Sequence, residues 1–311
     1  MSEHELNLFE REHTYPDPDA KERYEALVGI DDAKLQVSRM LSILLNPDSL
    51  SAWANKFHPY ASDLIQSMME RPPLVVFEGE VGSGKSALAE CVGDPVSRAN
   101  GALSISLLPI SLSSRGTGRV GEMTALLSKA FDQVIDRGKR LRRPGKPPAG
   151  ALILLVDEAD AIAQSREASQ MHHEDKAGVN AFIRGLDRIS NERVPVAIIL
   201  CTNRLGALDP AVRRRAATIF KFARPNAEQR MEVVKEPLLV LGLKFQEIMK
   251  IVDVTGERPS QRLPGFTYSD LRQRLIPAIV LQAYPDQAVD PERAVEIAQM
   301  MTPTPSFKEE Q

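Results

Sequence analysis

The segment at residues 79–86 constrains the fold more than any other part of the chain. It reads Gly-Glu-Val-Gly-Ser-Gly-Lys-Ser, fits the pattern G-x-x-x-x-G-K-[ST], and lies between an apolar strand at 74–77 and a predicted helix at 86–92. Glycines let several backbone N–H groups converge on one point, and the amino end of the helix adds positive partial charge. The pattern therefore predicts an α/β protein that binds nucleotide phosphates; the alternative is a chance glycine-rich turn.

Each residue type in this loop has a predicted task. The ammonium of Lys85 reaches the terminal phosphates, and the hydroxyl of Ser86 is expected to ligate Mg²⁺. The predicted ligands are therefore ATP and Mg²⁺. The predicted nucleotide contacts in this segment are Gly79, Glu80, Val81, Gly82, Ser83, Gly84, Lys85, Ser86 and Ala87.

A second buried strand ends in adjacent carboxylates. Residues 152–156 are all apolar and run directly into Asp157 and Glu158, with Asp160 close behind. In an open parallel sheet, ligands bind at the carboxyl ends of the strands. Asp157 is therefore predicted to face the Mg²⁺, and Glu158 to orient the attacking water. The alternative is that Asp157 or Asp160 only caps the following helix.

Polar residues at two further points fit a site for nucleotide hydrolysis. Asn203 follows the apolar strand 196–201, where its amide could hold the lytic water or the γ-phosphate, although Thr202-Asn203 is equally typical of a simple turn. Three arginines at 213–215 precede the strand 218–222. They are either an exposed basic helix end or the source of an arginine finger for a neighbouring subunit's nucleotide.

Short apolar runs alternate with helical patterns as far as residue 224, and the runs lie at 74–77, 103–110, 152–156, 196–201 and 218–222. This alternation predicts a parallel five-stranded sheet with helices on both faces. After residue 224 the patterns are helical only, at 228–241, 246–254, 269–284 and 291–301. The predicted organisation is a flexible acidic segment at 1–24, an α/β domain at 25–224, and a small all-helical lid domain with a disordered tail at 225–311.

Composition argues against several classes of protein. Hydrophobic residues make up 43% of the chain, but no apolar run approaches the roughly 20 residues needed to span a bilayer. The first residues lack the apolar core of a secretory signal, so a cytoplasmic location is expected. Cys91 and Cys201 lie far apart and indicate neither a disulfide nor a zinc site. The net charge of −3 argues against a broad nucleic-acid surface, and the basic segment 137–146 has no interleaved aromatic residues for stacking.

The phosphate loop, the paired acids, Asn203 and the arginines, followed by a helical tail, together resemble the AAA+ ATPases. The resemblance covers about residues 25–300 and implies an AAA+ P-loop core with a helical lid. It implies that Lys85 and Ser86 hold phosphate and Mg²⁺. It also implies that Asp157 and Glu158 are the Walker B pair.

The same resemblance assigns three more parts of the site. Asn203 matches the position of sensor 1. The spacing from Leu208-Asp209 places the arginine finger at Arg215 or Arg214, with Arg215 favoured. The adenine contacts implied by the resemblance are Val28, Gly29 and Ile30.

A narrower similarity rests on residues 179–181, 186–189, 199–203, 215–216 and 265–284. These resemble the pachytene-checkpoint (thyroid-receptor-interactor) ATPases that remodel HORMA-domain proteins. Short chains of this type resemble bacterial members encoded beside nucleotide-second-messenger synthases in anti-phage (CBASS) operons. The resemblance implies a homo-hexamer that uses ATP to unfold part of a HORMA partner, either free or bound to a nucleotidyltransferase, and so switches off the partner complex.

The chain departs from the family pattern at two places. Ring remodellers usually grip peptide with an aromatic residue before a Gly-Glu pair, whereas Arg119 and Val120 stand there. Arg119 could pack its stem on a threaded peptide, or the loop could be a glycine-rich turn. At sensor 2, Ser269 stands where family members carry arginine, and Arg272 or Arg274 could substitute. His172-His173-Glu174 is either a solvated loop or a second pore loop.

Three functions compete on these observations. The first is a hexameric ATP-driven remodeller of a folded protein. The second is a nucleic-acid-directed AAA+ ATPase, such as a loader or transposition regulator, which only the basic segment supports. The third is a nucleotide-gated scaffold, against which Lys85, Asp157 and Glu158 argue.

Overall fold

The computed structural model describes residues 8–9, 11–111, 122–143, 146–160, 173–203 and 208–306. The chain divides into two compact units. The first comprises residues 1–25, 32–78 and 86–221, and the second comprises residues 26–31, 79–85 and 222–311. The second unit therefore contains the predicted phosphate loop together with the helical carboxyl-terminal region. The predicted domain boundaries at residues 24 and 224 stay predictions.

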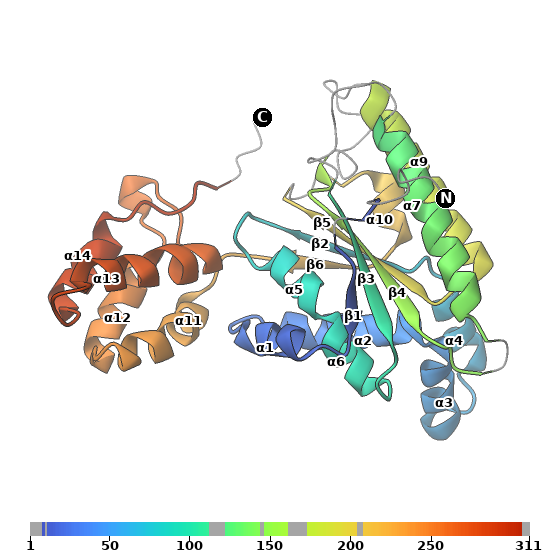
Figure 1. The fold of residues 1–311 in the computed structure, drawn as a ribbon, viewed down its shortest axis with the longest axis horizontal. Coiled ribbons are helices and arrows are strands. Elements are labelled where there is room, and N and C mark those ends of the chain that lie inside the picture. The colour runs from blue at the N-terminus through green and yellow to red at the C-terminus, as the bar shows by residue number, and fades with distance from the viewer. Residues whose placement is uncertain are drawn as a thin grey trace. The chain divides into compact units, whose positions relative to one another are not determined.

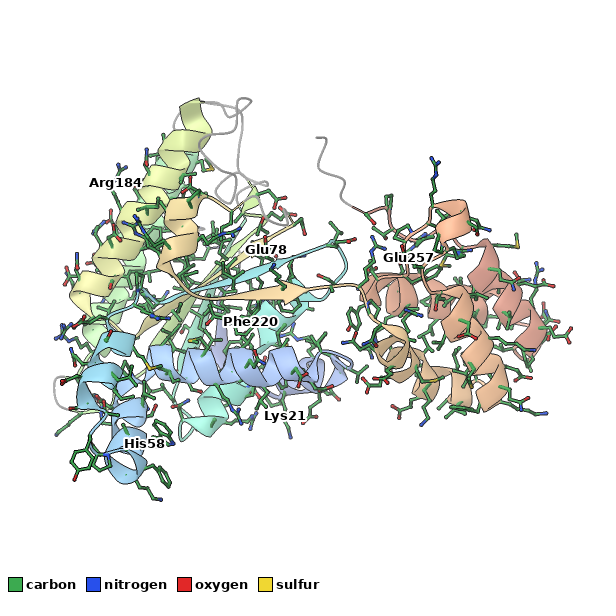
Figure 2. All side chains as sticks on the ribbon, turned by 180° about the vertical axis from the view of Figure 1, so that it is seen from behind. Lys21, His58, Glu78, Arg184, Phe220 and Glu257 are labelled. Carbon is green, nitrogen blue, oxygen red and sulfur yellow. The ribbon has the colours of Figure 1, made fainter. Side chains whose placement is uncertain are left out.

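The first unit is built on a sheet with the strand order β1-β3-β4-β5-β2-β6 (Figure 1). Its strands are β1 (His13–Tyr15), β2 (Leu74–Gly79), β3 (Ile105–Ser111), β4 (Ala151–Asp157), β5 (Val196–Thr202) and β6 (Ala216–Phe222). β3, β4, β5 and β2 run parallel to one another. Their nearly continuous apolar runs suit strands that are buried on both faces. The parallel register brings the carboxyl ends of β4, β5 and β2 to one edge, where Glu78 pairs with Thr202.

A strand that the sequence did not predict extends this sheet to six strands. β1 pairs antiparallel with β3, and α1 (Pro18–Ala26) follows it. Tyr15 is fully buried, its hydroxyl donates to the carbonyl of Glu90, and its ring lies where a Cβ on Gly93 would be. Burying one large aromatic side chain offsets the entropy lost in ordering a short segment. The expectation of a flexible lead-in is therefore corrected for residues 13–24; residues 1–7 lie outside the described ranges.

Helices cover both faces of the sheet (Figure 1). On one side, α7 (Glu122–Leu141) packs on α9 (His173–Glu192), and α7 also packs on β4 and β5. Phe131 meets Phe182 edge-on there, with 5.7 Å between ring centroids, and Gly185 leaves room for the Phe131 ring. The other helices of this unit among the described residues are α2 (Asp31–Leu45), α3 (Pro47–Phe57), α4 (Ser62–Met69), α5 (Lys85–Cys91), α6 (Gly93–Ala99) and α10 (Pro210–Arg215).

The carboxyl-terminal part of the second unit is helical, as the sequence predicts. Its elements are α11 (Ala227–Val240), α12 (Phe245–Val254), the 3-10 turn η2 (Pro259–Gln261), η3 (Asp270–Leu275), α13 (Ile276–Ala283) and α14 (Pro291–Met300). The helix predicted at 269–284 is split, because η3 is a π-helix in which the amide of Ile276 donates to the carbonyl of Leu271. Pro277 lacks the N–H that a regular helix would use at this point, which accounts for the irregular turn.

Candidate functional site

The loop that follows β2 has a backbone that its glycines permit. Gly82 and Gly84 have φ angles of 76° and 96°, in the left-handed region that side chains disfavour. A Cβ on Gly79 would lie 2.2 Å from the carbonyl oxygen of Phe222, so this position has no room for a side chain. The hydroxyl of Ser83 closes the loop by donating to the carbonyl of Glu80 at 2.7 Å. The G-x-x-x-x-G-K-S pattern thus forms a tight loop that leads directly into α5.

The ammonium of Lys85 lies inside this loop. Lys85 is only 6% exposed, and its Nζ donates to the carbonyls of Gly79 at 2.9 Å and Glu80 at 2.7 Å. A nearly buried cation surrounded by backbone groups suits an anionic ligand such as phosphate. Ser86 follows in the first turn of α5 and offers a hydroxyl oxygen, the kind of ligand that Mg²⁺ accepts. These residue types fit the triphosphate and the metal ion that the sequence predicts.

Glu80 has a partner that sequence reasoning did not identify. Its Oε2 accepts a hydrogen bond from Nε of Arg224 at 2.7 Å, and another nitrogen of the same guanidinium donates to the carbonyl of Gly265 at 2.5 Å. The two side chains are only 21% and 12% exposed, so the ion pair is screened less than a surface pair would be. Arg224 thereby connects the phosphate loop to the segment before η3. The only sequence signal was a charged residue in a glycine-rich loop.

The predicted adenine contacts lie in the same unit as the phosphate loop. The carbonyl of Gly29, whose φ is 79°, accepts hydrogen bonds from Nε2 of Gln229 at 2.7 Å and from the hydroxyl of Tyr268 at 2.8 Å. Burial raises the pKa of Tyr268 to about 12, so this hydroxyl stays a donor at neutral pH. Val28 packs against the helical core, and the side chain of Ile30 lies next to Gly84. The structure thus brings residues 28–30 together with the phosphate loop.

The residues predicted for sensor 2 take different positions. The amide of Ser269 donates to the carbonyl of Gly82 at 3.1 Å, so this backbone contacts the phosphate loop directly. Arg272 donates to the carbonyl of Ala26. Arg274 donates to the buried carboxylate of Asp270 at 2.6 Å and to the carbonyl of Thr302 at 3.1 Å. Both arginines therefore already have acceptors, and the choice between them as sensor 2 stays open.

In the first unit, the predicted acids and Asn203 meet at the carboxyl edge of the sheet. Glu158 has a φ of 50°, an uncommon conformation for a residue with a side chain, and its amide donates to Oδ1 of Asp157 at 2.8 Å. Strain of this kind often occurs at functional sites. Oδ1 of Asp160 accepts hydrogen bonds from the hydroxyl of Thr202 and from the amide of Asn203, both at 2.8 Å. Asp160, considered above only as a helix cap, instead connects the end of β4 to the end of β5.

The predicted arginine finger has a partner within its own chain. Asp209 caps α10 by accepting from the amide of Ala211 at 2.8 Å. At the other end of α10, Nε and one terminal nitrogen of Arg215 donate to the two carboxylate oxygens of Asp187 on α9, at 2.7 and 2.9 Å. The hydrogen bonds that Arg215 donates to Asp187 raise the pKa of Arg215. Arg214 is exposed. The sequence had no signal for the Asp187 contact, because it joins two separate helices.

Several predicted residues cannot be placed. Arg119 and Val120 of the predicted pore loop lie outside the described residues, as does His172. His173 and Glu174 begin α9, but their side chains are not among those described. The assignment of this segment as a solvated loop or a second pore loop therefore stays a prediction.

Known proteins match this chain over nearly its whole length. A family model described as "ATPase family associated with various cellular activities (AAA)" matches residues 75–224. The "CD-NTase-associated protein 6" of Escherichia coli strain MS 115-1 is 51% identical over 304 residues, which are 98% of this chain and 97% of that protein. The chain belongs to the CD-NTase-associated protein 6 family. The AAA domain implies that the chain binds ATP.

Solved structures of related chains have the same fold as this CD-NTase-associated protein 6 homologue. One, from the structure of the E. coli MS115-1 HORMA:CdnC:Trip13 complex, is 51% identical with a TM-score of 0.83, and the match covers 96% of this chain and 98% of that one. Another, Rhizobiales Trip13, is 48% identical with a TM-score of 0.75 and matches 96% of this chain and 99% of that one. Both resemblances inferred from the sequence are thereby confirmed. No helix in the described ranges is long and apolar enough to cross a membrane.

Proposed function

We propose that this protein is an ATP-driven ring ATPase that partly unfolds a HORMA-domain partner and disassembles the partner's complex. In this way it regulates an anti-phage second-messenger (CBASS) system in the cytoplasm. One observation carries the proposal: a chain 51% identical to this one was solved in a HORMA:CdnC:Trip13 complex, and the match covers 96% of this chain. The partner is therefore a HORMA-domain protein, in its free form or bound to a nucleotidyltransferase.

The proposed chemistry assigns one task to each polar residue. Lys85 binds the terminal phosphates, and Glu158 orients the water that attacks the γ-phosphate. Ser86 and Asp157 would hold Mg²⁺, since hydroxyl and carboxylate oxygens are ligands that it prefers. When bound, Mg²⁺ neutralises charge that develops on the phosphate oxygens. Asn203 positions the water or the γ-phosphate. Its backbone amide donates to Oδ1 of Asp160 at 2.8 Å, and this hydrogen bond holds the backbone of Asn203 in place.

We assign the arginine finger to Arg215, with Arg214 as the alternative, and propose that it acts on the nucleotide of the next subunit in a homo-hexamer. The ion pair with Asp187 supports this assignment. Asp187 positions the finger, since it holds the guanidinium of Arg215 in a fixed geometry at the end of α10. A finger supplied by a neighbour makes turnover depend on assembly. We also propose that Arg119 and Val120 contact the client peptide in the pore.

The stimulation of ATP hydrolysis by a partner distinguishes the remodeller from the nucleic-acid-directed ATPase. ATP hydrolysis by the full chain would be measured alone, with the HORMA-domain protein of the E. coli MS115-1 complex, and with duplex or single-stranded DNA. The remodeller is expected to respond to the HORMA protein and not to DNA. Stimulation by DNA alone would favour the nucleic-acid-directed alternative. A chain that binds ATP but whose Glu158→Gln variant hydrolyses it as fast as the wild type would contradict the catalytic assignment.

A further inference from the structure

The first unit contains a pocket at the edge of the sheet opposite the carboxyl ends of its parallel strands. Pro73, Pro148 and Pro195, which precede β2, β4 and β5, contribute to its wall. The helical hairpin α3–α4 and the carboxyl ends of α7 and α9 supply other parts, and these elements lie together at the lower right of Figure 1. The pocket has a volume of about 450 Å³. Pockets for small ligands typically measure about 300–1,000 Å³, so a small molecule fits.

The pocket is strongly cationic in a chain whose net charge is −3. The cationic residues that line it are Arg71, Arg142, Arg143, Lys146 and Arg193, against two acids, Asp48 and Glu70. Arg142 donates to the carbonyl of Glu192 at 3.2 Å. The other four cations form no ion pair with any other residue in the described part of the chain. Like charges around one hollow repel one another, and an anionic ligand would relieve that repulsion.

The backbone conformation of Arg193 is a second observation that favours a binding role for this pocket. It lies in the short connection between α9 and β5, and its φ is 48°, in the left-handed region. Glycine adopts this conformation freely, whereas a residue with a side chain is strained. Here the residue in the strained conformation is an arginine that lines the pocket. Guanidinium groups bind phosphate and carboxylate through paired hydrogen bonds.

Apart from Gln66 and Ser190, the rest of the lining is apolar. Leu44, Ile189 and Val194 contribute to it, and Ile189 and Val194 are 1% and 6% exposed. Among the described lining residues none is aromatic, so the pocket offers no platform on which the bases of a nucleic acid could stack. Cations beside an apolar floor suit a ligand that combines an anionic group with an apolar body.

We propose that this pocket binds a small organic anion, with its phosphate or carboxylate group held by Arg143 and Arg193 and its apolar body against Leu44 and Val194. The site is distinct from the proposed nucleotide site. It lies at the amino ends of β2 and β5, whereas the phosphate loop and Asn203 follow their carboxyl ends. The proposal does not depend on the remodelling function.

The probe for this site is 1-anilinonaphthalene-8-sulfonate, which carries one anionic group on an aromatic body and fluoresces when shielded from water. The chain has a single tryptophan, Trp53, on α3, and the first residues of α3, Pro47 and Asp48, line the pocket. Energy transfer from Trp53 therefore reports the binding of the probe near this helix. Titration of the full chain is expected to show saturable binding at one site.

Two variants and a control identify the binding groups. Arg193→Gly removes a guanidinium and suits the left-handed backbone, so it is expected to fold as well as the wild type. Arg143→Gln removes a second guanidinium. Each is expected to weaken probe binding about tenfold, the usual scale for a lost charge-assisted hydrogen bond. The control, Arg39→Gln, removes the same charge from an exposed position on α2 that does not line the pocket and should bind like the wild type.

Competition tests the ligand class. Phenyl phosphate and benzoate, which distinguish a phosphate from a carboxylate ligand, are expected to displace the probe at lower concentrations than inorganic phosphate does. Inorganic phosphate as effective as phenyl phosphate would show that the apolar floor contributes nothing. That result would overturn the proposal. So would non-saturable binding, unchanged affinity in both arginine variants, or an equal loss in Arg39→Gln.

Discussion

Replacing Asp160 tests how the end of β4 is connected to the end of β5. One oxygen of its carboxylate accepts from the hydroxyl of Thr202 and from the amide of Asn203, both at 2.8 Å. Asp160→Ala leaves both donors without this acceptor, and Thr202 is only 1% exposed. An unsatisfied buried polar group costs about 1–3 kcal/mol, so the free energy of unfolding should fall by roughly 2–4 kcal/mol. Tm should fall by about 3–6 °C for a chain of this size.

Asp160→Asn is the matched control, because its amide oxygen can occupy the same position and accept both hydrogen bonds. It should lose less than half as much stability as Asp160→Ala. ATP turnover should fall further in the alanine variant, since Asn203 loses the support of its backbone, while the affinity for ATP stays near the wild-type value. Thermal unfolding and steady-state ATP hydrolysis measure both effects. Equal stability of wild type and Asp160→Ala, or equal losses in the two variants, would refute the reasoning.

Further predictions follow from other contacts. Glu158→Gly should raise the free energy of unfolding by up to about 1 kcal/mol, because it relieves the φ of 50°, yet it should stop turnover; a denaturant titration showing no gain over Glu158→Gln would contradict this. Arg215→Ala should lower kcat by about a thousandfold without weakening ATP binding, whereas Arg214→Ala should change it little; similar effects would remove the preference for Arg215. Burial raises the pKa of Asp270, but hydrogen bonds from Thr267, Thr304 and Arg274 outweigh it and hold the pKa below 3.8. Asp270 therefore stabilises the fold above that pH, and the stability is lost as the pH falls through the lowered value. Acid unfolding monitored by circular dichroism should show a shallower pH dependence in Asp270→Asn, and an unchanged profile would argue against this linkage.

Most of the sheet could be predicted because its central strands are long and apolar. Residues 152–156 and 196–201 were predicted as strands and became β4 (Ala151–Asp157) and β5 (Val196–Thr202). β1 could not be predicted in this way, because three residues carry no periodic pattern and their order depends on burial of Tyr15 beside Gly93. Local sequence specifies such a short strand poorly, since its stability comes from tertiary contacts.

In the candidate site too, features set by local sequence could be predicted, and features set by tertiary packing could not. The phosphate loop and the acids after β4 could be predicted from the sequence, because local spacing and chain order specify them, and their roles stay predictions. The hydrogen-bond partners of these residues could not be identified. Glu80 pairs with Arg224, and Asp160 accepts from the amide of Asn203, across long separations in the chain. Such pairs depend on how distant elements pack, and a single sequence holds no signal for that.

The most direct test of the central claim is disassembly of the client complex. The HORMA-domain protein and CdnC of the E. coli MS115-1 complex would be labelled with a donor and an acceptor dye. The loss of energy transfer would be followed after this ATPase is added with ATP. We predict dissociation with the wild-type protein and none with Lys85→Ala, Glu158→Gln or ADP. Dissociation that proceeds equally with Glu158→Gln, or a complex that stays intact while the wild-type protein hydrolyses ATP, would contradict the account.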